Sequence, residues 1–172
     1  MLSGSLVALV TPFKNNKVDF EKITELVKFH LKNKTSGLVI CATTGESPSL
    51  TKEEKITIIK CVSSIVKGKI PVIPATGTNN TETTIEMTHE AKKAGADMAL
   101  IVTPYYNKPT QEGMYLHYKK IADKVNIPII LYNVPGRTGV SIDPETVARL
   151  SVHENIIAIK ESSGSLDQVS NI

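Results

Sequence analysis

Six short apolar runs alternate along the chain with longer stretches in which apolar residues recur at helical spacing, and consecutive runs begin about 30 residues apart. Near-continuous apolar runs are typical of strands that are buried on both faces, and amphipathic stretches are typical of the helices that cover them. The pattern therefore predicts a parallel sheet covered by helices. The predicted strands are 6–10, 38–41, 72–75, 98–102, 129–132 and 156–159.

Capping residues mark where the predicted helices begin. Asp19 precedes the first helical stretch, and Thr51 with Glu54 three residues later has the pattern of a capping box. Pro144 follows Asp143 at the position where proline is favoured in a first helical turn. Two further helix starts are predicted at Thr81 and at Ser165, which has Gln168 three residues later.

Polar side chains follow every predicted strand, and this distribution bears on the architecture. In an open doubly wound sheet only the strands around the switch point contribute to a site, whereas a (β/α)8 barrel brings all carboxyl ends of its strands to one rim. We therefore favour the α/β class and the TIM (β/α)8 barrel over the open sheet. The strand-end residues are Thr11, Thr43, Thr44, Thr76, Thr103, Tyr105, Tyr106, Tyr132, Asn133, Lys160 and Glu161.

The number of strands conflicts with a closed barrel, because about six β/α units are visible where eight are needed. The first and sixth strands would then be open edges with unpaired backbone groups. We expect residues 1–172 to be a single barrel domain that is truncated at its C-terminal side, as a fragment or truncated product of a longer chain.

Composition narrows the class of protein. The 172 residues are 41% hydrophobic and 22% charged, which is ordinary for a globular protein. The net charge of +3 is spread without a basic run, so we expect no nucleic acid partner. No apolar run approaches the roughly 18 residues that span a bilayer, so we expect no membrane association. Cys41 and Cys61 lack metal or disulfide spacing, which favours a reducing cytoplasm.

Lys160 is the first candidate for chemistry. It ends the apolar run 156–159 and precedes Glu161, so an amine lies where a buried strand meets a loop. Desolvation there disfavours the ammonium and increases the share of free amine that can attack a carbonyl. A lysine with an exposed head group, or an ion pair with Glu161, explains the same position equally well when Lys160 is taken alone.

Tyr132 and Arg137 lie one strand–helix unit earlier. Tyr132 ends a strand and can act as a proton donor and acceptor, although a strand-end tyrosine is more often a core residue. Arg137 is expected on a glycine-rich loop, where its guanidinium can hold a carboxylate bidentately or simply be solvated.

Two further loops offer hydroxyl groups. Thr43 and Thr44 precede Gly45 and can bind a carboxylate through hydroxyl and N–H groups, although a turn with a helix entry accounts for them as well. Tyr105 and Tyr106 follow another strand, on a loop that prolines make stiff. Both packing and proton transfer are compatible with these two side chains.

Other chemistries find no support. The four histidines have no carboxylate or cysteine at ligand spacing, so we expect no metal site. The glycine-rich dinucleotide, P-loop and serine-hydrolase motifs do not occur.

Four ordered strings make the chain resemble a known family. They are TTGES at 43–47, TPYYNKPTQEG at 103–113, YNVPGRTG at 132–139 and IKESSG at 159–164. The chain is similar over residues 4–172 to the dihydrodipicolinate synthase family of pyruvate-dependent class I aldolases. Ala42 departs from the family, which usually has glycine there.

The resemblance implies an activity and a role for each residue. Lys160 would form an imine with pyruvate, whose enamine would attack L-aspartate 4-semialdehyde and lead to 4-hydroxy-tetrahydrodipicolinate in diaminopimelate and lysine biosynthesis. Tyr132, Thr44 and Tyr106 would form a proton relay, with Tyr106 crossing from a neighbouring subunit in a dimer or tetramer. Thr43 and Thr44 would hold the pyruvate carboxylate, and Arg137 the carboxylate of the semialdehyde. The resemblance implies no metal or organic cofactor.

Two alternatives to this activity stay open. A related aldolase would act on N-acetylneuraminate or on a 2-oxo-3-deoxy sugar acid, although those relatives usually lack the GRTG string at 136–139. A truncated remnant without catalytic activity is the second alternative.

Overall fold

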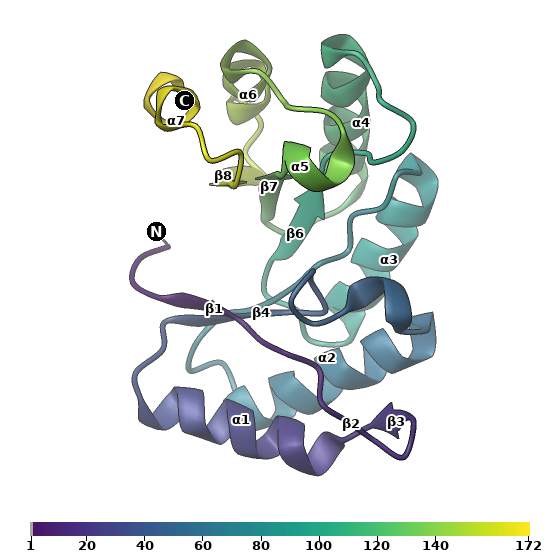
Figure 1. The fold of residues 1–172 in the computed structure, drawn as a ribbon, viewed down its shortest axis with the longest axis vertical. Helices are drawn as coiled ribbons and strands as arrows, with labels where there is room; N and C mark the ends of the chain where they lie inside the picture. Colours follow the sequence, from purple (N-terminus) through teal and green to yellow (C-terminus); the bar gives the residue numbers. More distant parts are fainter. Residues whose placement is uncertain (1) are drawn as a thin grey trace. The chain divides into compact units, whose positions relative to one another are not determined.

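The computed structural model describes residues 2–172, and the chain forms two compact units. The first comprises the chain up to Ala75 together with Glu90–Met98, and the second comprises Thr76–His89 and Ala99–Ile172. Each unit contains a three-stranded parallel sheet (Figure 1). The six predicted strands are all present in these two sheets, with bounds shifted by one or two residues.

The sheet of the first unit has the order β1–β4–β5, with β1 at Leu6–Ala8, β4 at Gly37–Ile40 and β5 at Val72–Pro74. Helices α1 (Phe20–Lys32) and α2 (Lys52–Val66) lie side by side along this sheet (Figure 1). Their apolar faces and the strands form one buried cluster, which includes Ile23, Val27, Leu38, Ile40, Ile59 and Val62.

The predicted caps of these helices are confirmed. Asp19 accepts a hydrogen bond from the backbone N–H of Lys22. Thr51 and Glu54 form the complete capping box, in which each side chain accepts from the backbone N–H of the other residue. These local bonds satisfy N–H groups that a helix start leaves without partners.

A short antiparallel pair was not predicted. β2 (Phe13–Lys14) and β3 (Lys17–Val18) are joined by Asn15 and Asn16, both in the left-handed conformation with φ of 53° and 59°. Asparagine tolerates this conformation, which the tight hairpin requires.

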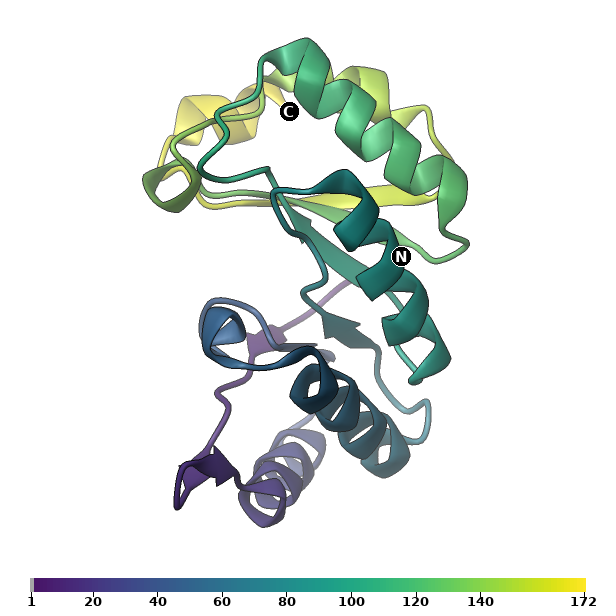
Figure 2. The same ribbon diagram turned by 90° about the vertical axis from the view of Figure 1, so that its right-hand side faces the viewer.

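The sheet of the second unit has the order β6–β7–β8, with β6 at Ala99–Val102, β7 at Ile129–Asn133 and β8 at Ile156–Glu161. Helix α4 (Gln111–Lys124), drawn in green in Figure 2, lies over one face of it. Tyr118 of α4 is fully buried, and its hydroxyl donates to the carbonyl of Ile101 at 3.1 Å. Burial raises the pKa of this phenol, which therefore stays protonated. The other helices that lie wholly within the unit are α5 (Pro135–Thr138), α6 (Pro144–Ser151) and α7 (Leu166–Asn171).

Two predicted helix starts are refined. α3 (Thr81–Lys93) begins at Thr81, but Asn80 provides the cap, because its side chain accepts from the N–H of Thr83. Ser165 caps α7 by accepting from the N–H of Gln168, whereas the Gln168 side chain donates to the carbonyl of Ile142.

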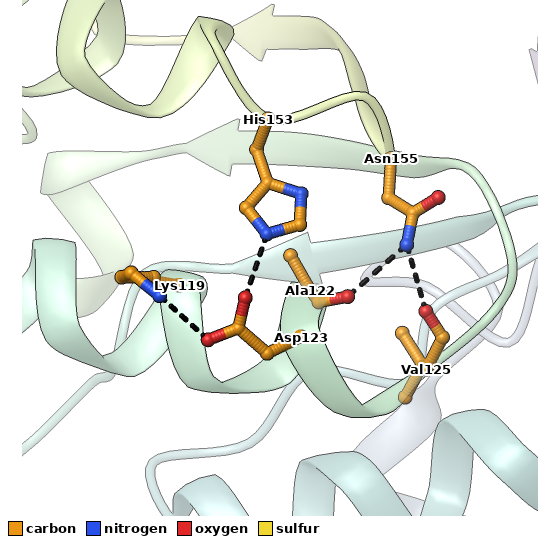
Figure 3. A network of polar contacts seen from close by, with 6 residues as sticks. All are labelled: Lys119, Ala122, Asp123, Val125, His153 and Asn155. Atoms are coloured by element: carbon orange, nitrogen blue, oxygen red, sulfur yellow. Dashed lines mark hydrogen bonds and ion pairs between the residues drawn. The ribbon is translucent and has the colours of Figure 1, made fainter.

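The loop that leads into β8 is fastened to the end of α4 (Figure 3). Asn155 donates from Nδ2 to the carbonyls of Ala122 and Val125 at 3.1 and 2.9 Å. His153 Nε2 lies 2.8 Å from Asp123 Oδ1, and Asp123 also pairs with Lys119. The amino end of β8 is thereby held next to β7, where Ile129 donates its N–H to the carbonyl of Asn155.

No helix within residues 2–172 is long and apolar enough to cross a membrane.

Candidate active site

The pairing of β7 with β8 contains an irregularity that sets the position of Lys160. Ile129 pairs with Ile156, but Ile130 pairs with Ala158, so β8 carries one extra residue at Ile157. Beyond this bulge the register is continuous and pairs Tyr132 with Lys160. Without the extra residue Ile159 would lie opposite Tyr132, because a shift of one residue exchanges the two faces of a strand.

Lys160 and Tyr132 are in direct contact. The Lys160 Nζ lies 4.3 Å from the centre of the Tyr132 ring, which is the geometry of a cation–π interaction. Tyr132 is buried, with 7% of its surface exposed, and Lys160 is half-buried. The sequence predicted Lys160 just beyond the end of its strand. In the structure Lys160 is the last residue but one of β8, which continues through Glu161.

Glu161 is hydrogen-bonded to Asn133 and Ser163 rather than paired with Lys160, the ion pair that the sequence suggested. Its Oε2 accepts from Asn133 Nδ2 at 2.8 Å, and its Oε1 accepts from the N–H of Ser163 at 2.6 Å. Partial burial acts to raise the pKa of this carboxyl, but the hydrogen bonds from Asn133, Ser163 and Gln168 outweigh burial and lower the pKa. Glu161 therefore stays ionised in its hydrogen-bonded position.

Arg137 lies on a short helix rather than on the predicted glycine-rich loop. α5 begins with Pro135 and ends at Thr138. Gly139 follows it with φ of 74° and donates its N–H to the carbonyl of Pro135. Proline at the first position and a left-handed glycine after the last one favour a single helical turn. The Arg137 side chain is exposed, so its guanidinium is accessible to an anion.

Tyr106 is held in an unusual backbone conformation. Its φ is 71°, in a region that large side chains rarely adopt, and 89% of its surface is exposed. Asn79 and Asn107 fix the loop, because Asn79 Nδ2 donates to Asn107 Oδ1 and Asn107 Nδ2 donates to the Asn79 carbonyl, both at 3.0 Å. The exposed aromatic side chain of Tyr106 thus lies on a loop that Asn79 fastens at the next residue, Asn107.

Thr43 and Thr44 belong to the first unit and have exposed side chains. Their loop is tightly packed underneath, since a side chain at Gly45 would approach the N of Cys41 and the carbonyl of Leu9 to 3.1 Å. The Thr11 hydroxyl donates to the Gly45 carbonyl at 2.7 Å. The threonines are followed by the 3-10 helix η1 (Ser47–Ser49), in keeping with the predicted turn and helix entry.

Cys41 is unsuited to be a nucleophile. Burial raises the pKa of its thiol to about 12, which outweighs the opposite effect of nearby Lys55. Burial also lowers the pKa of Lys55. The thiol therefore stays protonated, and a protonated thiol is a poor nucleophile.

The structure brings together part of the predicted residue set. Lys160, Tyr132, Arg137 and Tyr106 belong to the second unit, in which Lys160 contacts Tyr132, whereas Thr43 and Thr44 belong to the first. Sequence reasoning did not assign a role to Asn133, although it directly follows Tyr132 and is fully buried. A polar side chain next to a candidate catalytic residue at the end of an apolar run was the available signal.

Comparison with known proteins identifies the family. The model of the dihydrodipicolinate synthetase family matches residues 1–172. The chain belongs to this family. Among curated relatives, the 4-hydroxy-tetrahydrodipicolinate synthase of Geotalea uraniireducens is 60% identical over 172 residues, which are 100% of this chain and 59% of the relative. That of Trichlorobacter lovleyi is 58% identical with the same coverage.

Solved structures of the dihydrodipicolinate synthetase family agree with the fold. The dihydrodipicolinate synthase of Acinetobacter baumannii, solved in complex with pyruvate, is 47% identical, with a TM-score of 0.95 over 98% of this chain and 58% of that one. The Thermotoga maritima enzyme gives a TM-score of 0.96 at 47% identity over 98% of this chain and 57% of that one. The chain spans about 59% of the length of the curated relatives it matches. The predicted class, an α/β fold of the TIM-barrel type with about six of eight units, is confirmed. The boundary of a single domain over 1–172 stays a prediction.

Proposed function

We propose that the complete protein condenses pyruvate with L-aspartate 4-semialdehyde to form 4-hydroxy-tetrahydrodipicolinate, in the diaminopimelate and lysine pathway. The observation that carries the proposal is the Lys160 amine over the Tyr132 ring, within a chain of the dihydrodipicolinate synthetase family. The Acinetobacter relative that was solved with pyruvate supports the choice of the first substrate.

The chemistry begins with an imine. The neutral Lys160 amine attacks the carbonyl carbon of pyruvate, and loss of water gives the imine. Removal of a proton from the methyl carbon gives an enamine, which forms the new carbon–carbon bond to the aldehyde carbon of the semialdehyde. The amino group of the semialdehyde then attacks the imine carbon, which closes the ring and displaces the Lys160 amine. The protonated imine on Lys160 serves as the electron sink, so the proposal requires no metal or organic cofactor.

The other residues move protons and hold carboxylates. Tyr132 exchanges protons during these steps, in a relay with Thr44 and with Tyr106 from a neighbouring subunit. Thr43 and Thr44 bind the pyruvate carboxylate, and Arg137 binds the carboxylate of the semialdehyde. Because the relay needs Tyr106 from a neighbouring subunit, the functional assembly is a homo-oligomer that contains a dimer sharing Tyr106. We propose a tetramer as the final assembly and the cytoplasm as its location. The exposed side chain of Tyr106 on its braced loop supports this assignment.

Trapping of the imine tests the proposal. The complete protein is incubated with pyruvate and borohydride, and peptide mass mapping is expected to find the reduced adduct on Lys160. Lys119, which pairs with Asp123 on α4, serves as an internal control that should carry no adduct. Absence of an adduct on Lys160 would contradict the proposal.

Substrate comparison separates the proposal from its alternatives. Turnover of pyruvate with aspartate semialdehyde is expected, and cleavage of N-acetylneuraminate is not. Preference for the sugar acid would favour a related aldolase, and absence of both activities would favour a remnant without catalytic function.

A further inference from the structure

Asn133 and Glu161 form a hydrogen bond across the ends of β7 and β8, one residue beyond Tyr132 and Lys160. The Asn133 Nδ2 donates to Glu161 Oε2 at 2.8 Å. The two residues are register partners, as Tyr132 and Lys160 are. Because side chains alternate along a strand, Asn133 and Glu161 project from the opposite face of the sheet and do not reach the Lys160 amine.

The side-chain amide of Asn133 is fully buried, and its nitrogen and its oxygen both have hydrogen-bond partners. Besides the bond to Glu161, its Nδ2 lies 3.0 Å from Ser141 Oγ, and its Oδ1 accepts from the N–H of Ile142 at 3.2 Å. Its backbone carbonyl accepts from the N–H of Ser162 at 2.8 Å. One side chain therefore connects β7, β8 and the segment before α6.

The Glu161 carboxylate completes this connection. Its Oε1 accepts from the N–H of Ser163, so the loop after β8 is fastened to the same group that bonds Asn133. Hydrogen bonds to an ionised acceptor are about twice as strong as neutral ones. Asn155 holds the other end of β8, and at the end that carries Lys160 the Asn133–Glu161 bond adds to the backbone bond from Ser162 to Asn133.

We propose that the Asn133–Glu161 hydrogen bond is a positioning contact, which fixes the ends of β7 and β8 so that the Lys160 amine stays over the Tyr132 ring. Its consequence for catalysis rests on the function proposed above. Neither residue is a catalytic residue, because both act through the backbone. An amine displaced by about 1 Å from its productive position can react up to about a hundredfold more slowly.

Exchange of the two groups provides a specific test in the complete protein. Glu161→Gln places an NH2 against either the Asn133 amide or the Ser163 N–H, and Asn133→Asp places two carboxylates against each other. The double variant N133D/E161Q restores the bond in the opposite direction, because the new amide at position 161 can donate to the new carboxylate at position 133 while still accepting from Ser163. Ser141→Ala is the matched control, since it removes a different partner of Asn133 and leaves the cross-strand bond intact.

Two rates on Lys160 are measured for each variant. One is formation of the borohydride-reduced pyruvate adduct, and the other is acetylation by N-hydroxysulfosuccinimide acetate relative to Lys119 in the same sample. Each single variant is expected to slow adduct formation at least about tenfold and to change the acetylation ratio at least about threefold. The double variant and Ser141→Ala are expected within about threefold of the wild type in both measurements. If Glu161→Gln does not fold, Glu161→Asp replaces it with the same expected losses.

The outcomes separate the two proposals. Wild-type rates in the single variants, losses in Ser141→Ala equal to theirs, or a double variant as slow as the singles would each overturn the positioning role. A wild-type protein without any pyruvate adduct would contradict the proposed function instead. The acetylation ratio would then still decide whether Asn133 and Glu161 position Lys160.

Discussion

The amine of Lys160 lies 4.3 Å from the centre of the Tyr132 ring, and the two residues are register partners on neighbouring parallel strands. The contact joins a candidate nucleophile to a candidate proton carrier without any intervening residue. The aromatic ring and the phenol hydroxyl can therefore serve different purposes, one by holding the lysine and the other by transferring protons.

Tyr132→Phe separates these two purposes. The ring remains, so we expect the free energy of unfolding to change by less than about 1.5 kcal/mol. Turnover of pyruvate and aspartate semialdehyde is expected to fall by about 10²- to 10⁴-fold, because the proton carrier is lost. Steady-state kinetics and denaturant unfolding of the complete protein measure both quantities. Full turnover in Tyr132→Phe would remove the proposed proton transfer from Tyr132.

Arg137→Ala tests the proposed carboxylate site on α5. We expect the KM for aspartate semialdehyde to rise at least about tenfold, because a charge-assisted bidentate contact is lost, while the KM for pyruvate changes little. Arg137→Lys should recover only part of the affinity, since an ammonium cannot form the bidentate pair. Arg149→Ala is the control, because Arg149 pairs with Glu112 and stacks on Tyr115. An unchanged preference for the semialdehyde in Arg137→Ala would refute the assignment.

His117 predicts a dependence of stability on pH. Burial lowers its pKa from 6.5 to about 4, and Thr81 Oγ1 lies 2.8 Å from its Nδ1. Between pH 6.5 and about pH 4 the histidine of the unfolded chain binds a proton, whereas His117 in the folded chain does not. The contribution of His117 to the free energy of unfolding is therefore fully present above pH 6.5 and is lost as the pH falls toward 4, by about 3 kcal/mol.

His117→Gln should flatten this part of the pH profile, because glutamine can still bond Thr81 but does not titrate. Urea unfolding of the complete protein at several pH values between 7 and 4 measures the effect. His89→Gln is the control, since His89 is exposed on α3. Equal slopes for the wild type and His117→Gln would show that His117 does not cause the dependence.

Thr51→Ala removes the side chain that caps α2. The N–H of Glu54 loses its acceptor, and we expect the free energy of unfolding to fall by about 1 kcal/mol. Thr51→Ser should retain most of the stability because serine caps as well as threonine. Thr57→Ala in the same helix removes only an exposed hydroxyl that bonds the Glu53 carbonyl, and its effect should stay within about 0.5 kcal/mol. A loss in Thr57→Ala as large as that in Thr51→Ala would argue against a specific capping effect.

Much of the local structure was predictable from the sequence. The strand at 38–41 was visible because β4 is buried on both faces and so consists of apolar residues alone. Asp19 and the pair Thr51 and Glu54 marked helix starts because capping is a short-range bond between residues three positions apart. The single turn of α5 was not predicted, because glycine and proline in PGRT are equally compatible with a loop.

By itself, the sequence determined that Tyr132 and Lys160 each stand near the end of an apolar strand, because an apolar run stops where a polar side chain is placed. The structure shows that β7 is buried throughout, whereas only Ile156 of β8 is buried. Only the tertiary structure decided that the side chains of Tyr132 and Lys160 meet. The extra residue at Ile157 shifts the register of β8, and a shift of one residue moves every following side chain to the other face of the sheet. Register depends on backbone pairing between distant segments and on the partners that anchors such as Asn155 and Asn133 find there, and no local pattern in the chain reveals those partners.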